Sequence, residues 1–247
     1  MRRRWTVAVL MAVISAGSLS IGSFAQDKAK ADDKKDTSDE VRRMDAAATV
    51  LSEIMGAPDK GIPEEVMESA KCVAVVPSML KGGFIVGANY GKGVATCKTE
   101  TGWSAPAPFK LAGGSIGFQI GGEAVDVVML VMNEKGMNAL LNNKFKLGAD
   151  ASVAAGPVGR HAEGDTDWKM RAEVLSYSRA RGVFAGIALN GASISQDNDE
   201  TRILYGEKAP FVQILKGGVP PPAGAEKFLA AVKKYSSQAG TSAKADR

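Results

Sequence analysis

Ser115, Asp150 and His161 are the residues whose types and order along the chain could support catalysis. Ser115 lies in GGSIG (113–117), a literal match to the G-x-S-x-G motif of serine hydrolases. That motif requires a strand, a sharp turn that carries the serine, and then a helix. The residues that follow, FQIGGEAVDVV, are typical of another strand, and the single histidine stands in the polar loop PVGRHAEGD. A serine hydrolase is therefore a remote alternative, and we expect no enzyme activity.

Two other segments resemble phosphate and metal sites but fail at required positions. VGANYGKG (86–93) contains Gly-Lys, yet valine stands where the first glycine of a Walker loop belongs and glycine where its hydroxyl belongs. DND (197–199) opens like a calcium loop, but Arg202 and Lys208 occupy the positions of its glycine and glutamate. An acidic turn that caps a helix explains DND better. We predict no metal site and no cofactor.

Basic residues beside glycine-rich turns are better candidates for binding. Exposed glycine amides next to a cation can hold an anionic phosphate group, although a solvated loop can carry the same residues. The positions are Lys81, Lys92, Arg160, Arg179 and Arg181, together with Arg42 and Arg43 beside the apolar stripe of a helix predicted over 38–55. We predict that these side chains contact anionic lipid headgroups.

The elements that must position these residues are strands with an unusual density of glycine. KGGFIVGANYGKGV (81–94), LAGGSIGFQIGGEAVDVVMLVM (111–132) and RGVFAGIALNGASI (181–194) combine β-branched and aromatic residues with repeated glycine. Glycine weakens a strand, so its repeated use marks bends or close approach of another backbone. A further strand, CVAVV (72–76), is expected to stop at Pro77. With helices near both termini, the pattern predicts an α+β fold with a mainly antiparallel, curved, glycine-rich sheet or partial barrel.

The segment 38–55 is predicted to form an amphipathic helix. Ser38 suits the N-cap position, and Met44, Ala48 and Leu51 recur at three- and four-residue steps as one apolar stripe. Such a helix either packs on its own sheet or lies on a membrane surface, and the sequence leaves both open. Shorter helices are expected over 63–70, 134–142, 196–205, 210–215 and 225–235.

The first 25 residues have the features of a secretory signal peptide. Three arginines precede the apolar run VAVLMAVISAG, and Ser23 and Ala25 suit cleavage before Gln26, so we expect a periplasmic or secreted protein. Residues 26–37 are charged and poor in apolar side chains, which predicts a disordered spacer. We expect the binding domain over 38–216. A Pro/Gly linker, a short amphipathic helix and a frayed tail are expected over 217–247.

The balance of charge bears on the class of partner, and the two cysteines bear on the compartment. Three of the 31 basic residues would leave with the signal peptide, so 28 basic residues would face 27 acidic ones in the mature chain. A general nucleic-acid binder needs a basic face with many phosphate contacts, so we expect no nucleic-acid partner. Cys72 and Cys97 form a disulfide in an exported protein or remain as two buried thiols, and both alternatives stay open.

Four long stretches resemble, in the same order, the SYLF domain family, a lipid-binding module also known as the actin-binding domain of yeast endocytic proteins. They are AKCVAVVPSMLKGGFIVGANYGKGV (70–94), WSAPAPFKLAGGSIGFQIGGEAVDVVMLVM (103–132), LGADASVAAGPVGR (147–160) and AEVLSYSRARGVFAGIALNGASI (172–194), with LYG at 204–206. The resemblance covers roughly residues 40–216.

This resemblance implies a non-enzymatic module that binds phospholipids, phosphoinositides in eukaryotic relatives, and actin filaments in some of them. In those relatives an amphipathic N-terminal segment contributes to membrane attachment, and 38–55 is the matching position here. Bacterial members typically carry an export signal and no partner domain. We therefore predict an exported bacterial protein that binds a phospholipid or membrane surface. A protein-interaction or envelope-structural role is the alternative, with actin binding by family analogy alone and no protein partner identified.

Overall fold

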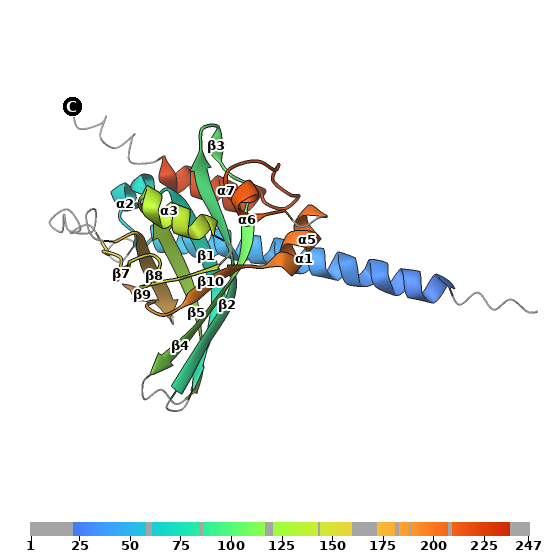
Figure 1. Ribbon diagram of the computed structural model, residues 1–247, viewed down its shortest axis with the longest axis horizontal. Helices are drawn as coiled ribbons and strands as arrows, with labels where there is room; N and C mark the ends of the chain where they lie inside the picture. The colour runs from blue at the N-terminus through green and yellow to red at the C-terminus, as the bar shows by residue number, and fades with distance from the viewer. Residues whose placement is uncertain are drawn as a thin grey trace, which may run out of the picture.

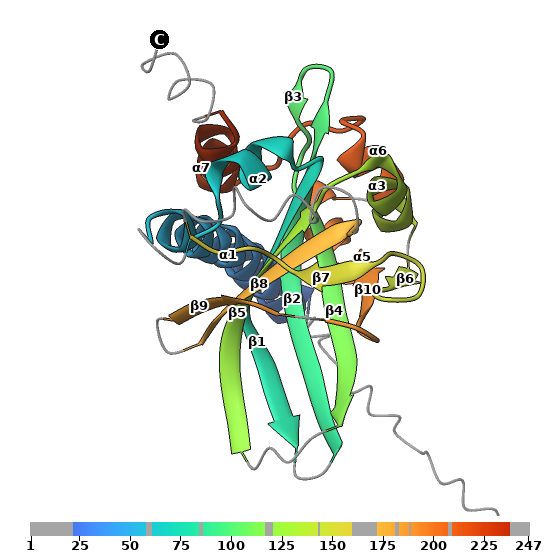
Figure 2. The same ribbon diagram turned by 90° about the vertical axis from the view of Figure 1, so that its left-hand side faces the viewer.

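In the part of the chain that the structure describes, a curled ten-stranded sheet carries helices across its outer face and at one end (Figures 1 and 2). The computed structural model describes residues 22–57, 61–83, 86–116, 121–142, 144–159, 172–180, 183–187, 189–206 and 209–237. All strand pairs are antiparallel except β7 with β8. The predicted α+β class with a curved, mainly antiparallel sheet is confirmed.

The strands follow the spatial order β6-β10-β4-β2-β1-β5-β8-β7, with β3 paired to β2 and β9 to β8. Their bounds are β1 (Cys72–Gly83), β2 (Val86–Thr99), β3 (Gly102–Trp103), β4 (Ala107–Ile116), β5 (Gly121–Val131), β6 (Lys144–Lys146), β7 (Val153–Ala155), β8 (Val174–Ala180), β9 (Val183–Gly186) and β10 (Ser193–Gln196). The longest four, β5, β1, β2 and β4, are neighbours and form the centre of the sheet.

The strand predicted to end at Pro77 instead continues to Gly83, so that expectation was wrong. The sheet accommodates the proline with a bulge: the register of β1 shifts against both neighbours between Val75 and Leu80. Ser78 takes a left-handed φ of 55° there, and its amide donates to Asp126 Oδ1 at 2.9 Å. A bulge is one of the few places where a strand tolerates proline, because the local ladder is already interrupted.

The helices lie close to the predicted positions, except at the start of the first. They are α1 (Gly22–Met55), α2 (Glu64–Ser69), α3 (Glu134–Leu141), α5 (Asn198–Tyr205), α6 (Phe211–Leu215) and α7 (Glu226–Ser236). Helix α1 therefore runs through 26–37, where we expected a disordered spacer, and Ser38 is not its N-cap. No glycine or proline occurs between Gly22 and Gly56, so nothing in this stretch breaks a helix.

Two hydrophobic layers cover the two faces of the central strands. On the inner, concave face, residues such as Ala74, Met129 and Phe109 pack with α3 and α6. On the outer face, alternate residues such as Val73 and Leu130 pack against α1 and α7. Both layers contain side chains with exposed fractions of 0–1%. The apolar stripe of 38–55 is thus used for packing on the sheet, which decides between the two alternatives for that helix.

A disulfide joins Cys72 to Cys97 across the paired ends of β1 and β2. The two residues are direct cross-strand partners, and both are buried. The bond therefore links the strands at the end of the hairpin opposite its turn.

Close packing explains two of the glycines in β2. A Cβ atom at Gly93 would lie 2.4 Å from the carbonyl oxygen of Val75 and 2.7 Å from the ring of Phe109. A Cβ atom at Gly91 would lie 2.5 Å from a methyl group of Val76. At these positions glycine lets the curved strands approach one another, as the sequence indicated.

The four central strands extend well beyond the helices (Figures 1 and 2). Helix α1 crosses their outer face near mid-length, and the ends toward Gly83, Val86, Ile116 and Gly121 project away from the body as a four-stranded sheet. We call the described residues 79–83, 86–91, 112–116 and 121–125 the projecting sheet. Within the described residues, no helix is both long enough and apolar enough to cross a membrane.

Candidate functional site: an ion-pair cluster and a projecting sheet

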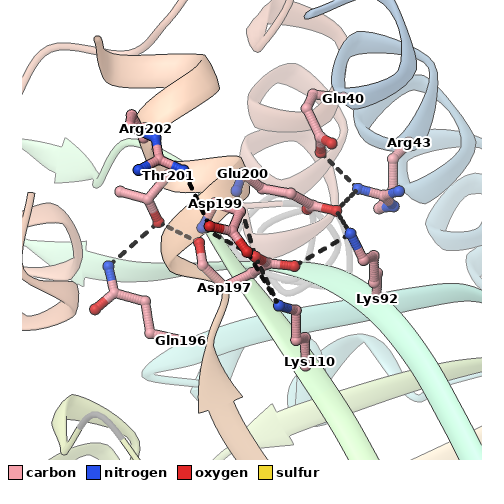
Figure 3. A network of polar contacts seen from close by, with 10 residues as sticks. All are labelled: Glu40, Arg43, Lys92, Lys110, Gln196, Asp197, Asp199, Glu200, Thr201 and Arg202. Carbon is pink, nitrogen blue, oxygen red and sulfur yellow. Dashed lines mark hydrogen bonds and ion pairs between the residues drawn. The ribbon is translucent and has the colours of Figure 1, made fainter. Parts of the chain in front are cut away.

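A cluster of charged residues joins α1, β2, β4 and α5 on the outer face of the sheet (Figure 3). Its members are Glu40, Arg43, Lys92, Lys110, Asp197, Asp199, Glu200 and Arg202. Asp197 and Glu200 are almost completely buried, with exposed fractions of 0% and 1%. Burial of charge is costly unless it is paired, so the geometry of the pairs decides what the cluster can do.

Glu200 is the shared acceptor at the centre of the cluster. Its Oε1 lies 2.6 Å from Nη1 of Arg43 and 2.5 Å from Nζ of Lys92. A second acceptor, Asp197, lies 3.3 Å from Nζ of Lys92 and 3.0 Å from Nζ of Lys110. The two lysines are direct cross-strand partners on β2 and β4, so the carboxylates between them offset a like-charge contact.

Local sequence explains why the two acids stand at this place. Asp197 is the N-cap of α5, and its side chain accepts from the amides of Asp199 and Glu200. The predicted helix-capping role of the DND segment is therefore confirmed. One turn of helix then places Glu200 above the strands, where Arg43 of α1 meets it (Figure 3).

The cluster shifts the pKa values of its members. Burial, together with a hydrogen bond to Glu200 and its negative charge, raises the pKa of Glu40 to about 8. For Lys92, burial acts to lower the pKa, but the hydrogen bond to Glu200 and its charge outweigh it and raise the pKa. Burial of Asp197 acts to raise its pKa, and the hydrogen bond from Lys110 reverses this and lowers it. At neutral pH Glu40 therefore holds a proton, while Asp197 and Glu200 face the three cations Arg43, Lys92 and Lys110.

A second ion-pair group ties α1 to the opposite side of the sheet. Arg179 of β8 donates from Nε to Oδ2 of Asp126 at 2.7 Å, and its Nη1 pairs with Glu53 of α1. Asp126 also accepts from the amide of Ser78, so the same carboxylate orders the bulge of β1. Helix α1 is thus held to the sheet by charge at two places along its length.

The structure separates the seven predicted lipid-binding cations into three groups. Arg43, Lys92 and Arg179 form internal ion pairs. Arg42 is 72% exposed and pairs with Asp39, and Lys81 is half-buried on the projecting sheet opposite Glu123. Arg160 and Arg181 lie outside the described residues.

The serine-hydrolase geometry is not supported where it can be assessed. Ser115 lies within β4, paired to Gly87 of β2, and the next described element is strand β5. A nucleophile elbow needs a helix there. Asp150 lies in a turn, where Oδ2 accepts from the amide of Lys146 at 2.7 Å. His161 lies outside the described residues, among which no group of His, Cys, Asp or Glu is arranged to hold a metal ion.

Sequence reasoning missed Glu40, Glu200 and Lys110, and it assigned Asp197 a helix-capping role alone. The Glu40–Arg43 contact at 2.5 Å is an i,i+3 helical pair, which the spacing could have indicated. The contacts of Glu200 with Lys92 and Arg43 join residues more than a hundred positions apart. They depend on tertiary packing, which no local pattern encodes.

The projecting sheet has two chemically different faces. Because side chains alternate and cross-strand partners share a face, the outer face continues from Lys92 to Tyr90 and Ala88. Its first row is Ala124, Leu80, Tyr90 and Ala112, and its second row contains Gly82, Ala88 and Gly114. All seven are exposed, Leu80 by 61% and Tyr90 by 45%. We call these seven residues the apolar face; the row between them on the inner face contains Glu123, Lys81 and Asn89.

An open groove also runs between α1 and α7. It has a volume of about 710 Å³, and its lining includes Ala48, Ala231 and Lys234. The pair Asp45–Lys227 at 2.6 Å spans it.

Comparison with known proteins gives a consistent result. The family described as Las17-binding protein actin regulator, Ysc84, matches residues 112–235. The SH3 domain-containing YSC84-like protein 1 of Rattus norvegicus is 37% identical over 187 residues, 73% of this chain and 55% of the relative. The human protein of that name is 35% identical over 187 residues, 73% of this chain and 54% of the relative. LAS seventeen-binding protein 3 of Saccharomyces cerevisiae is 33% identical over 175 residues, 69% of this chain and 38% of the relative. The chain spans about half the length of the animal relatives, and less of the yeast one.

Proposed function

The chain belongs to the Ysc84 (SYLF) family of Las17-binding actin regulators, and on that premise we propose that it is a non-enzymatic module that binds phospholipid membranes. The predicted family is thereby confirmed. The observation that carries the proposal is the exposure of Leu80 and Tyr90, directly paired on β1 and β2 of the projecting sheet. Large apolar side chains grouped on an exposed surface mark binding sites for apolar partners.

Only a few of the predicted basic side chains are accessible for contact with anionic headgroups. Arg43, Lys92 and Arg179 already have carboxylate partners, and removing them from those partners would cost more than a headgroup contact returns. Lys81 and Arg42 are the described predicted cations with accessible side chains. We therefore propose a mainly apolar contact with a small contribution from anionic headgroups.

Liposome flotation of residues 26–247 tests the proposal. We expect flotation with phosphatidylcholine vesicles and stronger flotation when phosphatidylglycerol is included. Raising the salt concentration should reduce only the difference between the two compositions, because salt screens the headgroup term and leaves the apolar term. A chain that stays at the bottom of the gradient with both compositions at low salt would contradict the proposed function.

We also propose that the protein is exported and acts in an oxidising compartment. The signal-like segment before Gln26 and the disulfide between Cys72 and Cys97 both favour this location. N-terminal sequencing of protein recovered outside the cytoplasm should begin at Gln26. Recovery of only the full-length chain, in the cytoplasm and with free thiols, would contradict export.

A protein-binding role is the second candidate, because the family is described as Las17-binding protein actin regulator and the yeast relative is named LAS seventeen-binding protein 3. Co-sedimentation with actin filaments tests the form of it that the family suggests. Sedimentation that saturates with filament concentration, without flotation on vesicles, would favour this candidate over the first.

A further inference from the structure

We propose that the apolar face of the projecting sheet is the surface that enters the membrane, with the outer face toward the lipid and the insertion limited to one leaflet. This inference rests on the proposed function and adds to it the surface, its orientation and its depth. Leu80, Tyr90, Ala112 and Ala124 form the row nearest the body, and Gly82, Ala88 and Gly114 form the next row outward.

The distribution of charge defines the surface. Neither row of the apolar face contains an ionisable side chain other than the phenol of Tyr90. The next residues toward the body on the same face, Asp126, Lys92 and Lys110, are charged, and each has a partner of opposite sign. A neutral region bounded by paired charges has no free charge that could bind a strongly acidic or basic partner. Such a region suits contact with the hydrocarbon of a membrane.

The shape of the surface favours lipid over a second protein. Five of its seven residues are glycine or alanine, so it offers few side chains that could fill pockets on a partner. The centres of protein interfaces are instead enriched in large aromatic residues, methionine and arginine, and depleted in alanine. Acyl chains are fluid and conform to a smooth surface.

The sequence at the same end of the sheet supports this occupant. The two connections there, between β1 and β2 and between β4 and β5, are FI (84–85) and GFQI (117–120). Hairpin connections usually consist of polar turn residues, glycine and proline. Neither connection contains a charged residue, and four of their six residues are Phe or Ile.

The dimensions of the apolar face limit the depth of insertion. At about 3.3 Å per residue, Ala88 lies about 13 Å along β2 from Lys92, so the neutral part of the outer face is short. Interfacial elements are buried by about 5–10 Å, whereas the hydrocarbon core is about 30 Å thick.

The outer edges of β4 and β5 near Gly114 and Ala124 have no strand partner among the described residues, and bare strand edges are excluded from the hydrocarbon core. The sheet therefore enters the headgroup and upper acyl region without spanning the bilayer, and Tyr90 lies at the level preferred by aromatic residues.

Flotation of charge variants on phosphatidylcholine vesicles tests the surface. Ala88→Asp and Leu80→Asp place a carboxylate on the apolar face, and each should reduce vesicle binding by about tenfold. Asn89→Asp is the matched control, because it adds the same charge on the same strand on the inner face, and it should change binding by less than about twofold. Thermal melts of all three variants test for misfolding. We expect unchanged melting temperatures, because Leu80 and Ala88 are exposed. In addition, Tyr90→Trp should show a blue shift and quenching by shallow brominated lipids when vesicles are added.

The outcomes distinguish failure of the proposed insertion surface from failure of the proposed membrane binding. Wild-type flotation with equal loss for Ala88→Asp and Asn89→Asp, or with no loss for either, overturns the surface and leaves membrane binding standing. Absence of wild-type flotation overturns both. A self-associated wild type that Ala88→Asp converts to monomer, with vesicle binding unchanged, assigns the face to a second copy of the chain and overturns the proposal.

Discussion

At the scale of single residues, Glu200 is the buried acceptor on which the cluster depends. Its carboxylate is shared by Arg43 and Lys92, and its Oε2 is buried without a donor unless Glu40 is protonated and supplies one. A proton on Glu40 therefore completes the cluster: one carboxyl donates, the other accepts, and the cations stay neutralised. Glu200 should therefore affect the stability of the fold, and Glu40 the dependence of that stability on pH.

Replacing Glu200 should destabilise the fold strongly. Glu200→Ala leaves Arg43 and Lys92 partly buried without their shared acceptor, and we expect a loss of about 2–4 kcal/mol in the free energy of unfolding. Asp199→Ala is the control from the same helix turn: its side chain is 73% exposed, and its loss should stay within about 0.5 kcal/mol. Chemical denaturation measures both losses, and a loss for Glu200→Ala no larger than that for Asp199→Ala would mean that the shared carboxylate of Glu200 does not stabilise the fold.

Glu40 should make stability dependent on pH in a defined window. Between its ordinary pKa of 4.5 and the folded value of about 8, the folded state keeps a proton that the unfolded state has lost. The free energy of unfolding should therefore fall as pH rises through this window, by at most about 1.4 kcal/mol per pH unit from this group. Glu40→Gln keeps a donor to Glu200 and cannot ionise, so its melting temperature should vary less with pH. Parallel pH profiles of variant and wild type would contradict the assignment.

At the scale of elements, local patterns predicted most helices and strands because their causes are local. Pro63, Pro210 and the acidic turn at Asp197 mark helix starts, and the apolar stripe of 38–55 is the face that packs on the sheet. The continuation of β1 past Pro77 could not be predicted in this way, because a side chain from β5 stabilises the bulge. The ion-pair cluster escaped prediction for the same reason: its partners meet only after the sheet and two helices have packed.

The glycines of β2 and β1 should differ sharply in their tolerance of a methyl group. Gly93→Ala places a Cβ atom 2.4 Å from a backbone oxygen of β1, and we expect a loss of about 3 kcal/mol in stability. Gly82→Ala is the matched control, because nothing lies within 4 Å of its Cβ position. That change should be neutral or stabilise by up to about 1 kcal/mol, since alanine has less conformational freedom when unfolded. Similar losses for both would show that strand propensity, not close packing, selects these glycines.

The disulfide should contribute stability of comparable size. Cys72 and Cys97 are 25 positions apart, and closing a loop of that length in the unfolded chain corresponds to about 3 kcal/mol. Reduction with dithiothreitol should therefore lower the melting temperature of the wild type. The double variant Cys72→Ala/Cys97→Ala should melt at the lower temperature with or without the reductant. A wild type that is insensitive to reductant would contradict this contribution.

At the scale of the whole molecule, the same four strands serve two purposes along their length. Near the disulfide they form the centre of a two-sided core, with Val73, Val75 and Val127 fully buried. Beyond α1 they have no described helix on either face (Figure 2). Leu80 and Tyr90 are exposed there. Backbone pairing through β1, β2, β4 and β5 resumes beyond the bulge of β1 and connects the two regions, so the buried half anchors the exposed half.

This division predicts a gradient of amide exchange along single strands. Opening the buried half requires loss of both hydrophobic layers, whereas opening the projecting half exposes little further apolar surface. Hydrogen–deuterium exchange followed by mass spectrometry should therefore show slow exchange for peptides covering 73–76 and 127–130, and much faster exchange for peptides covering 80–82 and 87–90. Glu200→Ala should accelerate exchange around 40–47, where its partner Arg43 lies, and should leave the order of protection along β1 unchanged. Uniform protection along β1 and β2 would mean that the projecting sheet is stabilised by something beyond its own strand pairing, and the anchoring role of the core would have to be abandoned.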